Sequence, residues 1–429
     1  MMIRENLLHF VWKHQKLPLG DLYTSSGEKL MVLRPGLHNH LSGPDFFNAQ
    51  VVIGTQEWAG NIEMHVKASD WYVHGHEKDP KYNTVILHIV WENDIDIFRN
   101  DTTRIPTLVL KEYLSSKLLM AHEKLLNKKE HKFINCEKEI GNLSHFLIKN
   151  WMDSLFIERL EEKTRRIEKR LKQFENDWEQ LTFILLLKNF GSKINGNSFH
   201  EIGKGLNFSM IRKIRHDRHQ LESVLFGMAG LLENTTIFDR YYTTLQDEFH
   251  FLKSKWNLKQ HSGGYPEFFR LRPTNFPTIR LSQFAGLYEK HNTVFGKLMA
   301  AETIAELRAI FEISASIYWK DHFTFGKVSK SSTKRLSKAF IDLLIINTII
   351  PLKFCYSRYR GEDVSESLLA IGMAIKKEHN SIVTNFETLK IPIAHAMHSQ
   401  AILQLYTSYC SANRCLQCAI GSNLMHTAV

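Results

Sequence analysis

DFFNAQVVIGTQEWAGNIEMHV, residues 45–66, is the stretch that decides the fold of the N-terminal part of this chain. It contains two strand-like runs, residues 45–53 and 57–66, separated by a turn signal at Gly54. A strand points successive side chains to opposite faces. In the second run apolar side chains alternate with polar ones: Ile62, Met64 and Val66 against Asn61, Glu63 and His65. We expect the apolar set to face the core and the polar set to form a site.

The sequence on either side predicts the rest of an N-terminal α/β core. Upstream, residues 4–14 place Leu7, Leu8, Val11 and Trp12 at helical spacing. The other expected elements are a strand at residues 29–33, a helical or irregular segment at 69–82, a buried central strand at 85–91 and a last strand at 105–110. Residues 1–115 are thus expected to form an αβββαβ core with one more strand at its end.

From residue 116 onward the periodicity is helical, so we expect residues 116–429 to form a separate, mostly α-helical region and the chain to be α+β overall. The helix at residues 151–174 is basic, with Arg159 and Lys163 among its cations, but acids dilute the charge. A solvated face is favoured there over one that follows phosphates. Helices are expected at residues 121–130, 151–174, 178–190, 209–232, 237–254, 280–289, 295–313, 333–348, 363–378 and 396–409.

Composition indicates a soluble protein with a polyanionic partner. The 429 residues carry a net charge of +10 at pH 7, and clustered Lys and Arg neutralise phosphates, so nucleic acid is the expected partner. No apolar run is long enough for a membrane span, because the closest, residues 340–354, is interrupted by Asp342 and Lys353. The N-terminus does not resemble a signal peptide, and the five cysteines do not resemble a secreted disulfide framework. We expect a cytoplasmic protein.

Candidate catalytic residues lie in the decisive stretch itself. Gly43-Pro44-Asp45-Phe46 is followed by Glu63-Met64-His65 on the next expected strand. Two carboxylates on adjacent strands supply the hard oxygen ligands that Mg²⁺ or Mn²⁺ prefers. Such a cation polarises a phosphate and lowers the pKa of an attacking water. Asp45 and Glu63 are the expected ligands; the alternative is that Asp45 caps a turn and Glu63 lies on a solvated strand face.

This pattern resembles the PD-(D/E)XK nuclease superfamily, in which a Pro-Asp starts one strand and (Asp/Glu)-X-Lys lies on the next. The resemblance implies a restriction-endonuclease-like core in which Asp45 and Glu63 bind the metal. His65 stands where the superfamily has its lysine, and it would orient or deprotonate the water or bind metal itself. Some members add an acid from the first helix, and Glu5 occupies the comparable position here.

A second polar group follows the two strands. His74-Gly75-His76, with Asp79, has the residue types of a metal site. The alternative is that these residues lie beside the carboxylates and position the substrate. His88, alone in the apolar run at 85–91, is expected to be a satisfied buried histidine rather than a ligand.

Two further groups lie in the helical region. Cys410-X4-Cys415-X2-Cys418 has a spacing that lets thiolates bind one soft metal, either Zn²⁺ or an iron–sulfur cluster, with a fourth ligand from Cys355, Cys136, His398 or His426. The alternative is a set of reduced structural thiols. In residues 268–280, arginines alternate with phenylalanines and prolines. Nucleic-acid binding through phosphate contacts and base stacking is expected there, or else a packed loop. The arginines are Arg270, Arg272 and Arg280.

Four runs together are similar to a bacterial family, domain of unknown function 2851: NHLSGPDFFNAQVVI, WAGNIEMHVKASDWYVHGHEKDPKYNTVILHIVW, FFRLRPTNFPTIRLSQ and QLYTSYCSANRCLQCAIG. The resemblance spans nearly the whole chain but implies no activity. The leading hypothesis is therefore a Mg²⁺- or Mn²⁺-dependent nuclease acting on DNA or RNA. The alternatives are a non-catalytic nucleic-acid-binding or scaffold protein with a degenerate nuclease core, motivated by the missing lysine, and a metal-dependent hydrolase of a small molecule.

Overall fold

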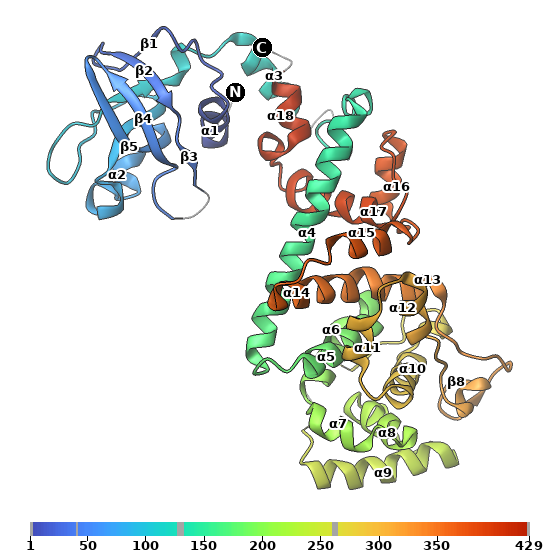
Figure 1. Ribbon diagram of the computed structural model, residues 1–429. Helices are drawn as coiled ribbons and strands as arrows, with labels where there is room; N and C mark the ends of the chain where they lie inside the picture. Colours follow the sequence, from blue (N-terminus) through green and yellow to red (C-terminus); the bar gives the residue numbers. More distant parts are fainter. Residues whose placement is uncertain (1–2, 40–41, 127–132, 260–264, 427–429) are drawn as a thin grey trace. The chain divides into compact units, whose positions relative to one another are not determined.

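The computed structural model describes residues 3–39, 42–126, 133–259 and 265–426, which fall into two compact units (Figure 1). Unit 1 comprises residues 1–151, 384–391 and 403–429, and unit 2 comprises residues 152–383 and 392–402. The C-terminal end of the chain therefore belongs to the same unit as the N-terminal core. The expected boundary near residue 116 lies inside unit 1, just ahead of helix α3 (Ser116–Leu126).

Unit 1 is built on a seven-stranded sheet with the order β1-β2-β4-β5-β6-β7, to which β3 is added by pairing with β4. β4 is antiparallel to β2 and β5, whereas β5, β6 and β7 are parallel. The strands are β1 (Leu22–Tyr23), β2 (Lys29–Arg34), β3 (Leu37–His38), β4 (Phe46–Ile53), β5 (Gln56–Lys67), β6 (Val85–Glu92) and β7 (Thr107–Val109). The expected strands are confirmed. β1 and β3 were not predicted, because a strand of two residues is too short to show an alternation of apolar and polar side chains.

The centre of the sheet is the pair β5 and β6. The first six residues of β6 are all buried, as expected of a parallel strand covered on both faces. Where β5 meets the start of β6, a Cβ on Gly60 would lie 2.4 Å from Cγ2 of Ile86 and 2.6 Å from the carbonyl oxygen of Thr84. Only glycine permits this close approach. The resulting register sets Glu63 opposite His88.

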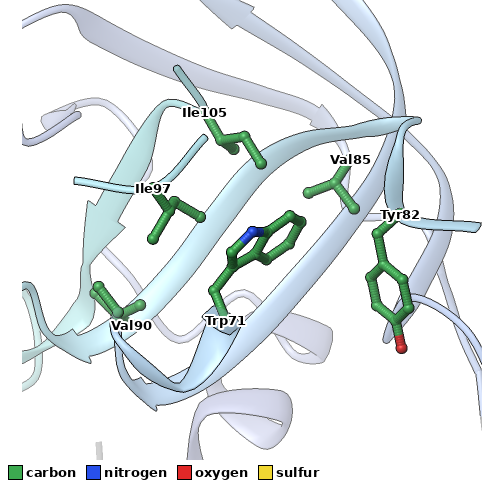
Figure 2. Packing of buried hydrophobic residues seen from close by; sticks show 7 residues of the cluster. Trp71, Tyr82, Val85, Val90, Ile97 and Ile105 are labelled. Atoms are coloured by element: carbon green, nitrogen blue, oxygen red, sulfur yellow. The ribbon is translucent and has the colours of Figure 1, made fainter. Parts of the chain in front are cut away.

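Short helices connect β5 to β6 and cover the sheet. α2 (Asp70–Val73) and the 3-10 helices η1 (His76–Lys78) and η2 (Pro80–Tyr82) form this connection. Figure 2 shows the indole of Trp71 at the middle of the hydrophobic cluster beneath them. The cluster consists of Ala68, Trp71, Tyr82, Val85, Val90, Ile97 and Ile105. The ambiguous segment at 69–82 is thus a chain of short helices fixed by aromatic anchors.

The remaining helices of unit 1 come from both ends of the chain. α1 (Glu5–Lys13) buries the apolar face expected from the sequence. The others are α3, the 3-10 helices η3 (Leu110–Glu112) and η5 (Ile140–Asn142), the start of α4 (His145–Gln173), most of α16 (Ser381–Thr388), the π-helix η9 (Leu405–Cys410), the 3-10 helix η10 (Cys415–Gln417) and α18 (Ala419–His426).

Unit 2 is mostly helical, as expected. Besides the rest of α4 it contains α5 (Trp178–Phe190), α6 (Ser192–Lys204), α7 (Phe208–Ile214), α8 (Arg218–Met228), α9 (Arg240–Trp256), η6 (Pro273–Asn275), α10 (Pro277–Lys290), α11 (Val294–Ala300), α12 (Ile304–Ile310), η7 (Ile317–Lys320), α13 (Lys338–Leu344), the π-helix η8 (Ile345–Ile349), α14 (Ile350–Arg360), α15 (Ser365–Met373) and α17 (Ala396–Gln404). A small hairpin pairs β8 (His322–Thr324) with β9 (Lys327–Val328).

Two of the expected long helices are wrong, each because a capping residue interrupts the apolar period. Residues 209–232 form α7 and α8, since the Asp217 carboxylate accepts the backbone N–H groups of residues 219 and 220 and starts a new helix. Residues 295–313 form α11 and α12, since Thr303 and Glu306 make a capping box.

The apolar run near residue 340 is a helix of the core of unit 2. Among the described residues, Lys338–Arg360 is the one continuous helix long and apolar enough to cross a membrane, and 67% of its most apolar window is buried. Such burial is typical of a core helix in a soluble protein.

Arg159 and Lys163 do not lie on a solvated face of α4, which corrects the expectation for these two residues. The Arg159 guanidinium donates to Oε1 of Gln400 (2.7 Å), and the Lys163 ammonium donates to the same oxygen (2.9 Å) and to Oδ1 of Asn347 (3.1 Å). Burial, followed by the charge of Arg159, lowers the pKa of Lys163 to about 7. The unfolded chain holds a proton on this lysine up to about pH 10.

Replacing Lys163 with Met is therefore expected to change how stability depends on pH. Between about pH 7 and about pH 10 the unfolded wild-type chain binds a proton at this position that the folded chain does not, so wild-type stability gains roughly 1 kcal/mol per pH unit from Lys163. Lys163→Met lacks this contribution. Denaturant unfolding of both chains across this range measures it, and two parallel pH profiles would contradict a lowered lysine pKa.

Candidate metal centre

Asp45 and Glu63 lie next to each other where β4 begins. The backbone N–H of Asp45 donates to Oε2 of Glu63 (3.1 Å), and the backbone N–H of Met64 donates to Oδ2 of Asp45 (2.9 Å). The register of β4 against β5 shifts between Phe46 and Ala49, and Asn48 between them has φ 55°. This bulge follows Asp45 directly, and bulges commonly re-aim side chains next to functional sites.

Glu63 is not on a solvated strand face. Its neighbour His65 points the same way along β5, and both residues are buried, with 5% and 1% of their surface exposed. Ile62 and Met64 on the opposite face are also buried. The strand is thus enclosed on both sides, and the polar side chains of this face lie among other buried residues rather than in solvent. The group of side chains around Glu63, from Glu5 to His88, is called the pocket below.

Two buried imidazoles contact the Glu63 carboxylate, and a third, on the exposed His74, contacts one of them. Nε2 of His65 lies 3.6 Å from Oε1 of Glu63 and 3.1 Å from Nδ1 of His74. Nε2 of His76 lies 3.3 Å from the same carboxylate oxygen. One ring nitrogen from each histidine lies within 4.8 Å of the others. Tetrahedral ligands at about 2.0 Å from an ion are separated by roughly 3.3 Å. The 3.1 Å between His65 and His74 matches this spacing, and the nitrogen of His76 lies within 4.8 Å of both.

Aromatic residues behind the pocket hold these imidazoles in place. Nδ1 of His65 lies 2.8 Å from Nε2 of His88, so a His65 that offers Nε2 to a metal donates its other N–H to His88. The His76 ring stacks on Tyr82 with centroids 3.8 Å apart. Trp71 meets the His76 and His88 rings edge to face at 5.4 and 5.7 Å. His88 is buried as expected, but only its Nε2 has a partner, since its Nδ1 makes no hydrogen bond within the described residues.

Charge in the pocket favours a bound cation. Burial, followed by the charge of Asp45, raises the pKa of Glu63 to about 9, and the same two causes raise the pKa of Glu5. Burial and the neighbouring Asp45 thus disfavour the charged forms of Glu63 and Glu5, and a bound cation would remove that penalty. Burial lowers the pKa of His65 to about 3, which keeps its imidazole neutral and able to ligate.

The sequence profile of the family described as Protein of unknown function (DUF2851) matches residues 5–381. The chain belongs to this family. The match includes every residue of the pocket, from Glu5 to His88, and ends before the three C-terminal cysteines. No curated protein and no solved structure was found to be similar to the DUF2851 chain.

His9 is the pocket residue of the DUF2851 chain that sequence reasoning missed. Its Nε2 lies 3.2 Å from Oδ2 of Asp45. Burial lowers the pKa of His9, but the hydrogen bond and charge of Asp45 outweigh burial and raise it overall. The available signal was the spacing of Glu5 and His9, which puts both on one face of α1.

The other candidate residues lie outside this pocket. The Asp79 carboxylate accepts the backbone N–H of residue 81 and caps η2. In unit 2, Arg280 is buried, donates to Asn275 and Gln283, and stacks 3.5 Å from the Phe340 ring centroid. Arg270 and Arg272 are exposed. Cys410, Cys415 and Cys418 are free thiols of unit 1.

Proposed function

We propose that this DUF2851 protein is a divalent-metal-dependent nuclease that hydrolyses phosphodiester bonds of DNA or RNA. The observation that carries the proposal is the convergence of the Asp45 and Glu63 carboxylates, from adjacent strands, with the imidazole of His65. A metal bound there would polarise a phosphate and lower the pKa of a water, which is the chemistry that phosphodiester hydrolysis needs.

The topology supports a PD-(D/E)XK-like arrangement. Apart from the two-residue strands, unit 1 runs α1, β2, β4, β5, α2 and β6, which is the αβββαβ order. The strand that starts after Asp45 is antiparallel to the strand that carries Glu63, and the next strand is parallel to it. Asp45 directly precedes β4 and Glu63 lies on β5, and these positions support the proposal.

The donor set bears on which cation fits. Glu63 offers an oxygen, while His65, His74 and His76 offer nitrogens. Nε2 of His76 is buried, and although it lies 3.3 Å from Oε1 of Glu63 it makes no hydrogen bond within the described chain, so it is available as a metal ligand. Mg²⁺ prefers oxygen ligands almost exclusively. Mn²⁺ also prefers oxygen but accepts imidazole nitrogen beside it, and Zn²⁺ binds imidazole well. Of the two cations expected, Mn²⁺ therefore fits better than Mg²⁺, and Zn²⁺ fits also. In this assignment His65 is a ligand rather than a replacement for the lysine.

A cleft beside His9 is suited to a nucleic-acid strand. Its volume is about 190 Å³, and its lining includes Lys13, His14 and Tyr409 of unit 1. Basic groups bind phosphates, and an aromatic ring can stack on an unpaired base. The net charge of +10 supports the same partner, and the free cysteines support a reducing cytoplasm.

Cleavage assays with the purified full chain test the function. Supercoiled plasmid, single-stranded DNA and RNA are each incubated with Mg²⁺, Mn²⁺ or Zn²⁺, and with EDTA. We expect cutting with Mn²⁺, none with EDTA, and none in Asp45→Ala, which should still bind nucleic acid. Binding without cutting in every metal would instead identify the scaffold alternative. A chain without affinity for any polyanion would leave the small-molecule hydrolase.

A further inference from the structure

We propose that the cleft beside His9 binds one unpaired nucleotide of the substrate, so that the protein acts on single-stranded DNA or RNA and not within an intact duplex. The inference rests on the proposed nuclease function and names the substrate class of that site. Three features of unit 1 carry it: the position of the cleft beside recessed carboxylates, the charge of its lining, and its size.

The cleft lies beside the proposed metal ligands, because His9 takes part in both. α1 and its C-cap residue supply one wall, with Asn6, His9, Lys13 and His14. Nε2 of His9 lies 3.2 Å from Oδ2 of Asp45. One imidazole thus separates the cleft from the carboxylate. A strand with its phosphate at Asp45 has an adjacent nucleotide within reach of the cleft.

The carboxylates that would meet the phosphate are recessed. The side chains of Asp45 and Glu63 are 22% and 7% exposed, and that of His9 is 20% exposed. In a duplex the bases are paired and stacked, so a nucleotide has to leave the stack before it can enter a recess. A single strand pays no such cost and can turn its phosphate and base inward. The recess therefore favours an unpaired substrate.

Basic side chains line the cleft, and no carboxylate of the described chain does. Lys13, His14 and His38 belong to the lining. The His14 ring meets the His426 ring with centroids 5.0 Å apart, and the charges that act on His14 are those of His426, Lys13 and Lys16. A gathering of basic groups without a carboxylate suits a phosphate.

Asn6 and Tyr409 add contacts for the rest of a nucleotide. Oδ1 of Asn6 is buried and makes no hydrogen bond within the described residues, so it can accept from a hydroxyl or amino group. The Tyr409 ring, which also lines the cleft, packs edge to face on Trp151 at 5.4 Å. Such a ring can stack on an unpaired base. A nucleotide offers a phosphate, polar donors and an aromatic face, and the cleft has a counterpart for each.

The size of the cleft limits what can enter it. Its volume of about 190 Å³ lies below the roughly 300–1,000 Å³ of pockets that enclose a whole small ligand. There is room for part of one nucleotide and none for a base pair. A base can therefore occupy the cleft only when it is unpaired and unstacked.

Binding measured in EDTA tests the inference separately from cleavage. Fluorescence anisotropy with the full chain compares a labelled single strand with a blunt duplex of the same sequence. We expect the single strand to bind about 10-fold more tightly, the order of effect that stacking of one base on an aromatic ring gives. Lys13→Gln should weaken single-strand binding and lower its log–log salt slope by about 0.7, the value for one phosphate contact. Lys29→Gln, exposed in unit 1 and outside the cleft, is the matched control.

Asn6→Asp is a second variant, because it places a negative charge in the cleft with almost no change of shape. It should weaken single-strand binding by roughly 10-fold. With Mn²⁺, cutting is expected in the unpaired arms of a forked duplex and not in its paired region.

Equal binding of strand and duplex, or an unchanged salt slope in Lys13→Gln, would overturn the inference. Cutting between paired bases would also overturn it, while leaving the nuclease proposal in place. Single-strand binding that depends on Lys13, without cutting in any metal, would support the cleft and contradict the nuclease.

Discussion

Glu63→Gln is expected to lower Mn²⁺ affinity and phosphodiester cleavage by about 100-fold or more while leaving the fold intact. Oε1 of Glu63 is the atom around which the pocket is arranged, 3.3 Å from Nε2 of His76 and 3.6 Å from Nε2 of His65. Glutamine keeps the length of the side chain and an oxygen that can accept the N–H of Asp45. It lacks the charge that makes a carboxylate a strong ligand.

Titration calorimetry with Mn²⁺ and the plasmid assay measure these two losses. Glu57→Gln is the control, because Glu57 is exposed on the same strand and outside the pocket. If folded Glu63→Gln bound Mn²⁺ with unchanged affinity, the Glu63 carboxylate would not be a metal ligand.

Trp71→Ala is expected to destabilise unit 1 by about 3–5 kcal/mol, the usual cost of truncating a buried aromatic residue to alanine. The indole is fully buried at the centre of the cluster in Figure 2. Its Nε1 donates to the carbonyl oxygen of Phe98 (3.2 Å). Because the ring also contacts His76 and His88, the cavity should loosen the metal pocket as well.

Denaturant unfolding gives the loss of stability, and Mn²⁺ titration of the folded variant gives the loss of affinity. Val73→Ala is the matched control on α2, since Val73 is 76% exposed and should cost little. A loss below about 1 kcal/mol for Trp71→Ala would mean that this cluster does not anchor the connection between β5 and β6.

Much of the core of unit 1 was predictable from sequence because strands alternate by geometry. The apolar run at 85–91 predicted a buried strand, which is confirmed, and the alternation in residues 61–65 predicted that Asn61, Glu63 and His65 share one face. The placement of Asp45 beside Glu63 followed from two consecutive strands. The alternation could not predict that both faces of β5 are buried. That burial depends on helices from other parts of the chain.

The residues that sequence reasoning missed or left open are joined by tertiary contacts. His9 reaches Asp45 from α1, and its one local signal is its spacing from Glu5. The two long helices predicted at 209–232 and 295–313 failed for another reason. Their capping residues, Asp217 and Thr303, can be recognised in the sequence, but the prediction gave more weight to the apolar periodicity.

The central claim is that one divalent ion is bound at the carboxylates of Asp45 and Glu63, with nitrogen ligands from His65, His74 and His76. Pulsed electron paramagnetic resonance of the Mn²⁺-loaded chain tests it most directly, because couplings to imidazole nitrogen report histidine ligands. We expect nitrogen couplings from more than one histidine in the wild type and fewer in His74→Ala. Mn²⁺ bound through oxygen ligands alone, or not bound tightly at all, would contradict the account.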